Sequence, residues 1–277
     1  MPCPVTLAAV DTLGIIAGNR GLPLLVAEQA RAQGVERLVA VAIEGETDKR
    51  ITELADEVTW VKVGQLGKLV RAFQDTGVRQ CVMAGQVAPR NLFDLRPDLR
   101  AAKLLWNLKQ KNAHSIFSAI ADELAAEGIE LVEAPPWLQP AMPGADYQVG
   151  PIPNDNQLED IRHAHAIAIE VARLDIGQVV VVKDGAVLAV EGWEGTDACL
   201  TRGGELAGSK GGAVAVKVAK PSHDFRFDIP CLGEKTLETC AASSIAVLAF
   251  EAGRTLLLDR EAVEEAATRH KVTVAAV

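Results

Sequence analysis

This chain of 277 residues lacks the features that mark several protein classes. Its five cysteines are odd in number and form no C-x-x-C pair, which favours a reducing compartment over a disulfide framework. No uninterrupted apolar run approaches the roughly 20 residues that cross a bilayer. The first ten residues also lack the basic start of a signal peptide. We therefore expect a cytoplasmic protein.

The chain is also poor in basic charge. Its formal net charge is -9 at pH 7, whereas a general nucleic-acid binder needs a basic field to displace counterions from the phosphate backbone. The four tryptophans are too dispersed in the sequence to form a stacking platform. We expect no nucleic-acid partner, although local basic clusters can still bind a nucleotide.

What the chain has is apolar content, 49% of its residues, which can bury two substantial cores. Its first half alternates between short apolar strands and helices. Strands are predicted at 13–17, 38–43, 80–84 and 129–133, and helices at 23–33, 65–75, 98–109 and 115–127. Right-handed crossovers between such strands give a Rossmann-like parallel sheet with ligand-binding loops at the strand carboxyl ends.

Six prolines lie between Ala134 and Asn156. We interpret residues 135–156 as a proline-rich linker between a Rossmann-like α/β domain at 1–134 and an α/β catalytic domain at 157–277. The second part is predicted to contain a helix at 155–173, with Leu158, Ile161, Ala168 and Ala172 inward. A hairpin at 179–183 and 186–190 follows, with strands at 213–219, 245–250, 255–258 and 272–276 and a helix at 261–270. We therefore expect two α/β domains, the second with a mixed sheet.

The most informative stretch runs from Lys217 to Gly233. It crowds Lys217, Lys220, Asp224, Arg226 and Asp228 between an apolar strand and a predicted helix. Lysine and arginine side chains neutralise phosphoryl oxygens, and carboxylates bind a hard cation such as Mg²⁺. The stretch therefore favours phosphoanhydride chemistry, with a solvated loop of opposite charges as the alternative.

A second motif, Gly192 to Leu200, follows the predicted hairpin. Thr196 or Asp197 opens a helix there, and ordinary capping of the helix amides explains such residues. The functional reading is an anion site, because a helix start after Gly195 exposes backbone NH groups to an oxyanion. In that reading Asp197 contributes to a bound cation.

The turn Gly18-Asn19-Arg20-Gly21 follows the first predicted strand. Its glycines lack the G-x-G-x-x-G spacing, so an NAD-dependent oxidoreductase, which Glu44 at the end of the next strand would support, is the weaker alternative. A nucleotide could use the same strand-end geometry. Gly85, which follows the predicted strand at 80–84, has a similar double interpretation. The structural alternative is a tight βα turn.

Several runs of residues match one family in order and spacing over roughly a hundred residues. They are Leu174-Asp175-Ile176-Gly177-Gln178, Ala189-Val190-Glu191-Gly192, Glu194-Gly195-Thr196-Asp197, Lys220-Pro221, Arg226-Phe227-Asp228-Ile229-Pro230-Cys231-Leu232-Gly233 with Thr236, and Glu251-Ala252-Gly253. Weaker matches lie at 13–23 and 84–87. The chain thus resembles the LpxI-type UDP-2,3-diacylglucosamine pyrophosphatases, bacterial enzymes of lipid A (lipopolysaccharide) biosynthesis. It departs from them at Lys111 to Ser115, where the family usually has a glycine and paired acidic residues.

The resemblance implies a Mg²⁺-dependent or Mn²⁺-dependent hydrolase that cleaves UDP-2,3-diacylglucosamine to UMP and 2,3-diacylglucosamine 1-phosphate, with the substrate between the domains. Asp228 is the expected catalytic carboxylate and metal ligand, and Asp197 is the second candidate for both roles. The expected substrate-binding residues are Thr196, Lys217, Lys220, Arg226, Gly18, Asn19, Gly21 and Gly85. Asp224 is the candidate for an acid that structures its loop.

An acylated substrate implies transient contact with the inner-membrane surface. The altered segment at Asn112 to Ser115 leaves a different class open, a nucleotide-sugar or lipid-binding protein of the same architecture without hydrolysis. The sequence also leaves open the number of metal ions, the acyl lengths accepted, the phosphorus that water attacks, and whether the chain forms a homodimer.

Overall fold

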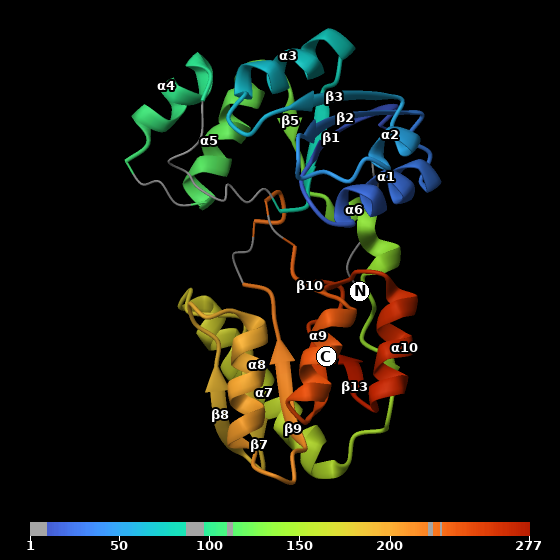
Figure 1. Cartoon of the computed structure of the whole chain (residues 1–277), viewed down its shortest axis with the longest axis vertical. Coiled ribbons are helices and arrows are strands. Elements are labelled where there is room, and N and C mark those ends of the chain that lie inside the picture. The colour runs from blue at the N-terminus through green and yellow to red at the C-terminus, as the bar shows by residue number, and fades with distance from the viewer. Residues whose placement is uncertain (1–9, 87–96, 110–112, 221–223, 228) are drawn as a thin grey trace. The chain divides into compact units, whose positions relative to one another are not determined.

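The structure is a computed structural model that describes residues 10–86, 97–109, 113–220, 224–227 and 229–277. The chain divides into two compact units (Figure 1). The first contains the chain up to Leu138 together with Asp224–Phe227, and the second contains the other described residues from Gln139 onward.

The first unit is built on a parallel five-stranded sheet in the order β3-β2-β1-β4-β5. Its strands are β1 (Thr12–Ala17), β2 (Arg37–Ile43), β3 (Glu57–Val61), β4 (Gln80–Ala84) and β5 (Glu130–Leu131). The Rossmann-like prediction is confirmed. The strand order reverses between β1 and β4, and sheets of this type commonly bind ligands at such a switch point, beside the carboxyl ends of the strands.

Helices cover both faces of this sheet. They are α1 (Leu22–Ala32), α2 (Ile51–Leu54), α3 (Leu66–Thr76), α4 (Leu99–Asn107), α5 (Ala113–Ala126) and α6 (Pro135–Leu138). Figure 1 shows α3, α4 and α5 on one face and α1, α2 and α6 on the other. Asp98 joins two of them, because its carboxylate accepts from the amide of Ala101 at the start of α4 (2.9 Å) and from that of Gly67 in α3 (2.7 Å).

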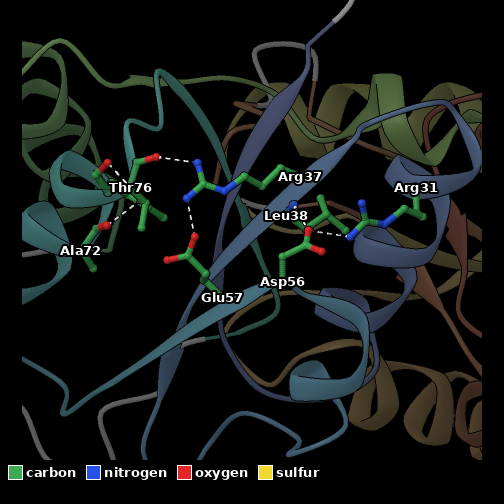
Figure 2. A network of polar contacts seen from close by, with 8 residues as sticks. Arg31, Arg37, Leu38, Asp56, Glu57, Ala72 and Thr76 are labelled. Atoms are coloured by element: carbon green, nitrogen blue, oxygen red, sulfur yellow. Dashed lines mark hydrogen bonds and ion pairs between the residues drawn. The ribbon is translucent and has the colours of Figure 1, made fainter.

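A polar network ties together the amino ends of β2 and β3 (Figure 2). Asp56 accepts from the Leu38 amide and from Arg31, both at 2.7 Å, and these contacts lower the pKa of its carboxyl below the ordinary 3.8, the Leu38 amide most. Arg37 pairs with Glu57 and donates to the carbonyl of Thr76 (2.9 Å). The network therefore ties together the end of the sheet opposite the loops that follow its strands.

The segment predicted as a proline-rich linker is folded rather than extended between domains. Helix α6 packs within the first unit, with Trp137 and Leu138 buried. A 3₁₀ turn (η1, Gln139–Ala141) and strand β6 (Gln148–Val149) belong to the second unit, where β6 pairs with β13. The apolar side chains between the prolines find partners to bury against, and the boundary between the units falls after Leu138.

The second unit is built on a six-stranded sheet in the order β6-β13-β11-β9-β7-β8. Its further strands are β7 (Val179–Lys183), β8 (Ala186–Val190), β9 (Ala213–Lys217), β11 (Ile245–Phe250) and β13 (Thr273–Ala276). Strands β9, β11 and β13 are parallel, and β6, β7 and β8 each run antiparallel to a neighbour, which confirms the predicted mixed sheet. Strands β10 (Cys231–Leu232) and β12 (Leu256–Leu257) pair separately.

Alternate side chains of this sheet enter two apolar layers. One layer packs against α7 (Asp155–Arg173), and the other against α8 (Thr196–Leu206), α9 (Glu234–Ala242) and α10 (Arg260–His270). The expected inward stripe of α7 is correct for Ile161, Ala168 and Ala172 but wrong for Leu158, which is 40% exposed. Asp160 already lies at the hairpin turn, so the residues before it extend past the edge of the sheet.

The predicted hairpin of β7 and β8 closes as expected. Asp184 and Gly185 both have positive φ, 49° and 77°, as a type I′ turn requires. The carboxylate of Asp160, which is only 4% exposed, accepts from the amides of both residues at 2.8 Å. One buried acid therefore satisfies the two amides of the turn.

The cysteines and the apolar helices bear on the expected cellular compartment. Cys81, Cys199, Cys231 and Cys240 are free thiols, and burial raises the pKa of Cys81, Cys199 and Cys240 to about 12, so these three remain protonated. In the described ranges, the longest apolar helices are too short or too charged to cross a membrane.

Candidate active site

Four of the predicted site residues lie at one end of the mixed sheet, where its parallel strands finish. Strand β9 ends at Lys217, and the antiparallel strand β7 begins beside it, since Val179 pairs with Lys217. Strand β8 ends at Val190, opposite Val180, and leads to Thr196 and Asp197 at the start of α8. The carboxyl edge of the parallel strands therefore brings together Lys217, Lys220, Thr196 and Asp197.

The two lysines at this edge have different partners. The ammonium of Lys217 donates to the carbonyl of Cys231 at 3.1 Å. That of Lys220 pairs with the carboxylate of Asp175, whose side chain is 76% exposed and whose φ is +58°. An exposed ion pair of this kind is weak, so a phosphate, with more charge, can replace Asp175 at Lys220.

The start of α8 differs from the capping expectation. Gly195, with φ +83°, is the N-cap residue and supplies no side chain, and neither Thr196 nor Asp197 caps the helix. Thr196 instead donates its hydroxyl proton to Oε1 of Glu191 at 3.0 Å, while Oε2 accepts from the amide of Gln178 at 2.8 Å. The first amides of α8 therefore have no capping side chain, which is the arrangement that anions exploit.

Asp197 is an exposed acid rather than part of a carboxylate cluster. Its side chain is 52% exposed and lies 3.7 Å from the ammonium of Lys235. No group of three His, Cys, Asp or Glu residues suited to a metal occurs among the residues with described positions. Asp228, its expected partner in metal binding and catalysis, lies outside the described residues.

Arg226 belongs to the first unit, although Lys217 and Lys220 belong to the second. Its guanidinium forms two bonds to Asp224, Nε to Oδ1 at 2.9 Å and Nη2 to Oδ2 at 2.7 Å, and this pairing raises the pKa of Arg226. The guanidinium also lies over the ring of Phe227, which stacks on Phe117 in α5. The charged stretch is thus two structures, and Asp224 orders the turn that carries Arg226.

The other predicted substrate residues lie at the switch point of the first sheet. The amides of Gly18 and Asn19 bond to the carbonyls of Ala84 (2.8 Å) and Gln86 (2.9 Å), which pulls the loops after β1 and β4 together. A Cβ on Gly18 would meet the Gln86 oxygen at 2.7 Å, and one on Gly85, where φ is +81°, would meet the Asn19 oxygen at 2.4 Å. Both glycines are therefore required by this close approach.

Gly21 and Asn19 have different environments at this turn. Gly21 is the N-cap residue of α1, with φ -78° and open space where a Cβ would stand, so local packing does not require glycine there. Asn19 donates Nδ2 to Glu46 at 3.1 Å, and within the described structure its buried Oδ1 accepts no bond. The side-chain amide of Asn19 is thus oriented by Glu46.

Sequence reasoning assigned no role to two acids at the edge of the mixed sheet. Glu191 follows β8 directly and Glu251 follows β11 directly, and both are largely buried, with Glu251 at 16% side-chain exposure. The signal that could have found them is an acidic residue immediately after a buried strand. Their bonds to backbone amides fix the loops that carry Thr196 and Lys220.

Similar proteins cover nearly the whole chain. Residues 12–140 match the sequence model of the LpxI N-terminal domain, and residues 147–275 match that of the LpxI C-terminal domain. A curated relative from Caulobacter vibrioides (strain ATCC 19089 / CIP 103742 / CB 15), "UDP-2,3-diacylglucosamine pyrophosphatase LpxI", is 34% identical over 268 residues, which cover 92% of this chain and 93% of the relative.

Solved structures give only distant likenesses. The biotin carboxylase domain of 2-oxoglutarate carboxylase from Hydrogenobacter thermophilus is 16% identical with a TM-score of 0.27, covering 71% of this chain and 41% of that one. N5-carboxyaminoimidazole ribonucleotide synthetase from Thermotoga maritima is 14% identical with a TM-score of 0.24, covering 67% and 42%. This chain thus spans less than half of either protein.

Both domain matches and the full-length relative agree, and the chain belongs to the LpxI family.

Proposed function

We propose that this chain hydrolyses the diphosphate of UDP-2,3-diacylglucosamine to UMP and 2,3-diacylglucosamine 1-phosphate, a step of lipid A biosynthesis. The observation that carries the proposal is the 34% identity, over 92% of the chain, to the relative whose name states that pyrophosphatase activity. Family membership favours this function over that of an NAD-dependent oxidoreductase.

The cations at the edge of the mixed sheet support the proposal chemically. Lys217 and Lys220 lie at and just beyond the end of β9, and the uncapped start of α8 faces the same edge. Fixed positive charges and oriented amides stabilise the charge that grows on phosphoryl oxygens when the bridging bond breaks. We assign the two lysines and α8 to the diphosphate, and Arg226 remains a proposed substrate-binding cation of the first unit.

Metal dependence is a separate part of the proposal. Among the described residues no three-ligand metal group occurs, and Asp197 is the exposed acid there that we assign to the cation. A hard cation such as Mg²⁺ or Mn²⁺ would therefore be held by substrate oxygens together with Asp197 and Asp228. When bound, the cation would neutralise diphosphate charge; Asp228 is assigned to orient the attacking water.

For the nucleotide, we propose the switch point of the first sheet. Gly18 and Gly85 bring the two loops together there, and Asn19, which Glu46 orients, is the side chain that we assign to the ligand. Exchanging Asn19 for Asp would retain the size of the side chain and remove its NH₂ group, which faces Glu46 at 3.1 Å. The exchange should weaken nucleotide binding through repulsion between the two acids.

Contact with the inner-membrane surface is also proposed, because the substrate is acylated. The second unit exposes three large apolar side chains, Leu174, Ile176 and Trp193, in the segments before β7 and after β8. Cosedimentation with phospholipid vesicles should fall when Trp193 is replaced by Ser, and equal cosedimentation would remove the proposal.

The experiment for the main proposal is product analysis. Purified chain with UDP-2,3-diacylglucosamine and Mg²⁺ should give equal amounts of UMP and the 1-phosphate by mass spectrometry, with UDP-N-acetylglucosamine as the control that lacks the two long acyl chains. A chain that binds the substrate and returns it intact is the non-hydrolytic alternative, which the altered segment at Asn112 to Ser115 motivates.

A further inference from the structure

The hydrogen-bond ladder of β9 ends before it reaches Lys220. Lys217 is the last β9 residue paired with β11, opposite Phe250. The amide of Val218 still bonds to the carbonyl of Gln178 at 3.0 Å, but the amide of Ala219 and the carbonyl of Lys220 lie beyond both neighbouring strands. Without other partners these groups would leave the backbone that carries Lys220 free to move.

Two side chains that follow β11 take the place of the missing ladder. The carboxylate of Glu251 accepts from the amide of Ala219 through Oε2 at 2.9 Å. Its Oε1 pairs with Nη1 of Arg254 at 3.1 Å, and Nη2 of Arg254 donates to the carbonyl of Lys220 at 3.0 Å. The carboxylate and the guanidinium therefore bind both ends of the Ala219–Lys220 dipeptide.

The chemistry of the Glu251–Arg254 pair indicates a role beyond stabilising the fold. The Glu251 side chain is only 16% exposed and that of Arg254 32%, so both charges are partly desolvated. The desolvation penalty offsets most of the attraction within such an ion pair, so the pair adds little to the stability of the fold. Each of the two side chains also forms one of the bonds given above to the backbone of Ala219 or Lys220, in the segment of the site lysines. Because a phosphate site requires its cations to be held near the productive geometry, such support acts on function.

We infer that Glu251 and Arg254 are positioning residues that hold the backbone of Lys217–Lys220 for diphosphate binding. The inference rests on the proposed function for its substrate. Glu251 itself contacts neither lysine side chain in the bonds described, so its effect passes through the Ala219 amide and through Arg254.

The test compares KM and kcat for UDP-2,3-diacylglucosamine in the full chain. Glu251→Gln keeps the shape but loses the charge that Arg254 pairs with, and it should raise KM about tenfold while kcat stays within about threefold. Arg254→Lys keeps the charge but cannot bridge Glu251 and the Lys220 carbonyl at once, so it should raise KM in the same direction.

A matched control separates positioning from stability. Asp160 is also a buried acid of the second unit that accepts two backbone amides, but at the opposite end of the sheet, in the β7–β8 turn. Asp160→Asn should lower the melting temperature and leave KM unchanged. A structural role for Glu251 predicts the same pattern, a lower melting temperature with unchanged KM, and that result would overturn the inference.

A second experiment tests the positioning role even if the proposed hydrolysis is not observed. If the wild-type chain does not turn over the UDP-lipid, titration with inorganic pyrophosphate in a calorimeter decides the inference. Wild type should then bind pyrophosphate about tenfold more tightly than Glu251→Gln, with Asp160→Asn equal to wild type. Equal dissociation constants for wild type and Glu251→Gln, or no binding by wild type, would contradict it.

Discussion

The hydroxyl of Thr196 donates its single proton to the carboxylate of Glu191 at 3.0 Å. Glu191 is 9% exposed, and its other oxygen accepts from the Gln178 amide. While this bond persists, Thr196 can accept a hydrogen bond but has no proton to give to a phosphate. In the proposed function, anion stabilisation at the start of α8 would therefore fall to its backbone amides, and Thr196 would fix the loop that presents them.

Thr196→Val should destabilise the chain while Thr196→Ser should not. Valine leaves a buried carboxylate oxygen of Glu191 without its donor, which costs about 1–3 kcal/mol, whereas serine restores the donor. Urea unfolding of the two variants beside wild type measures this difference. Equal midpoints for the valine and serine variants would show that the bond adds nothing to stability.

Asp175→Asn should strengthen substrate binding at low salt. Asparagine tolerates the left-handed conformation of this residue and removes the acid that pairs with Lys220. We expect KM for UDP-2,3-diacylglucosamine to fall about two- to threefold at low ionic strength, and the effect to disappear at high salt because the pair is exposed. Lys220→Gln should raise KM instead. A KM that does not respond to either change would remove Lys220 from the substrate site.

Asp56 should make stability sensitive to acid. Its folded pKa lies below the ordinary 3.8, so its ionised form stabilises the fold at pH values above 3.8, and this contribution is lost as pH falls through the lower folded pKa. Asp56→Asn should therefore unfold at lower urea than wild type at pH 7, with the difference shrinking toward pH 2. Asp146→Asn, which removes an exposed acid of the second unit, is the control. A difference that stays constant with pH would contradict the role of the charge.

Much of the fold follows from local patterns. The hairpin at 179–190 and the helix at 155–173 have the predicted bounds, because a run of β-branched valines with an Asp-Gly turn and a capping box at Asn154 each fix a local structure. Strand β3 had no such signal, since its residues before Val61 are only partly buried at this sheet edge. Within the 135–156 segment, proline counts do not report the burial of Trp137 and Leu138.

The site was less accessible to sequence reasoning. Lys217 and Arg226 are neighbours in sequence, yet the structure assigns them to different units, because Phe227 packs against the core of the first unit. Glu251 is more than thirty residues from the lysines it supports, and only the parallel pairing of β9 and β11 brings it beside them. Sequence proximity therefore did not predict how these residues are grouped in the fold.

Removal of metal should abolish turnover and leave the fold intact. If the diphosphate and the carboxylates of Asp197 and Asp228 hold the cation together, EDTA should stop UMP release, and Mg²⁺ or Mn²⁺ should restore it. The melting temperature should be the same with and without EDTA, since the described residues form no metal group of their own. Full activity in excess chelator would contradict the metal assignment.

The most direct test of the account is the rate of UMP release from UDP-2,3-diacylglucosamine by the wild-type chain and by Asp228→Asn, measured side by side with Mg²⁺ present. We expect wild type to convert the substrate fully to UMP and the 1-phosphate. The variant keeps the size of the side chain but not its charge, and it should turn over at least about a hundredfold more slowly with little change in melting temperature. Normal turnover by the variant would move the catalytic role away from Asp228. Absence of UMP from a folded wild-type chain that binds the substrate would contradict the pyrophosphatase assignment itself.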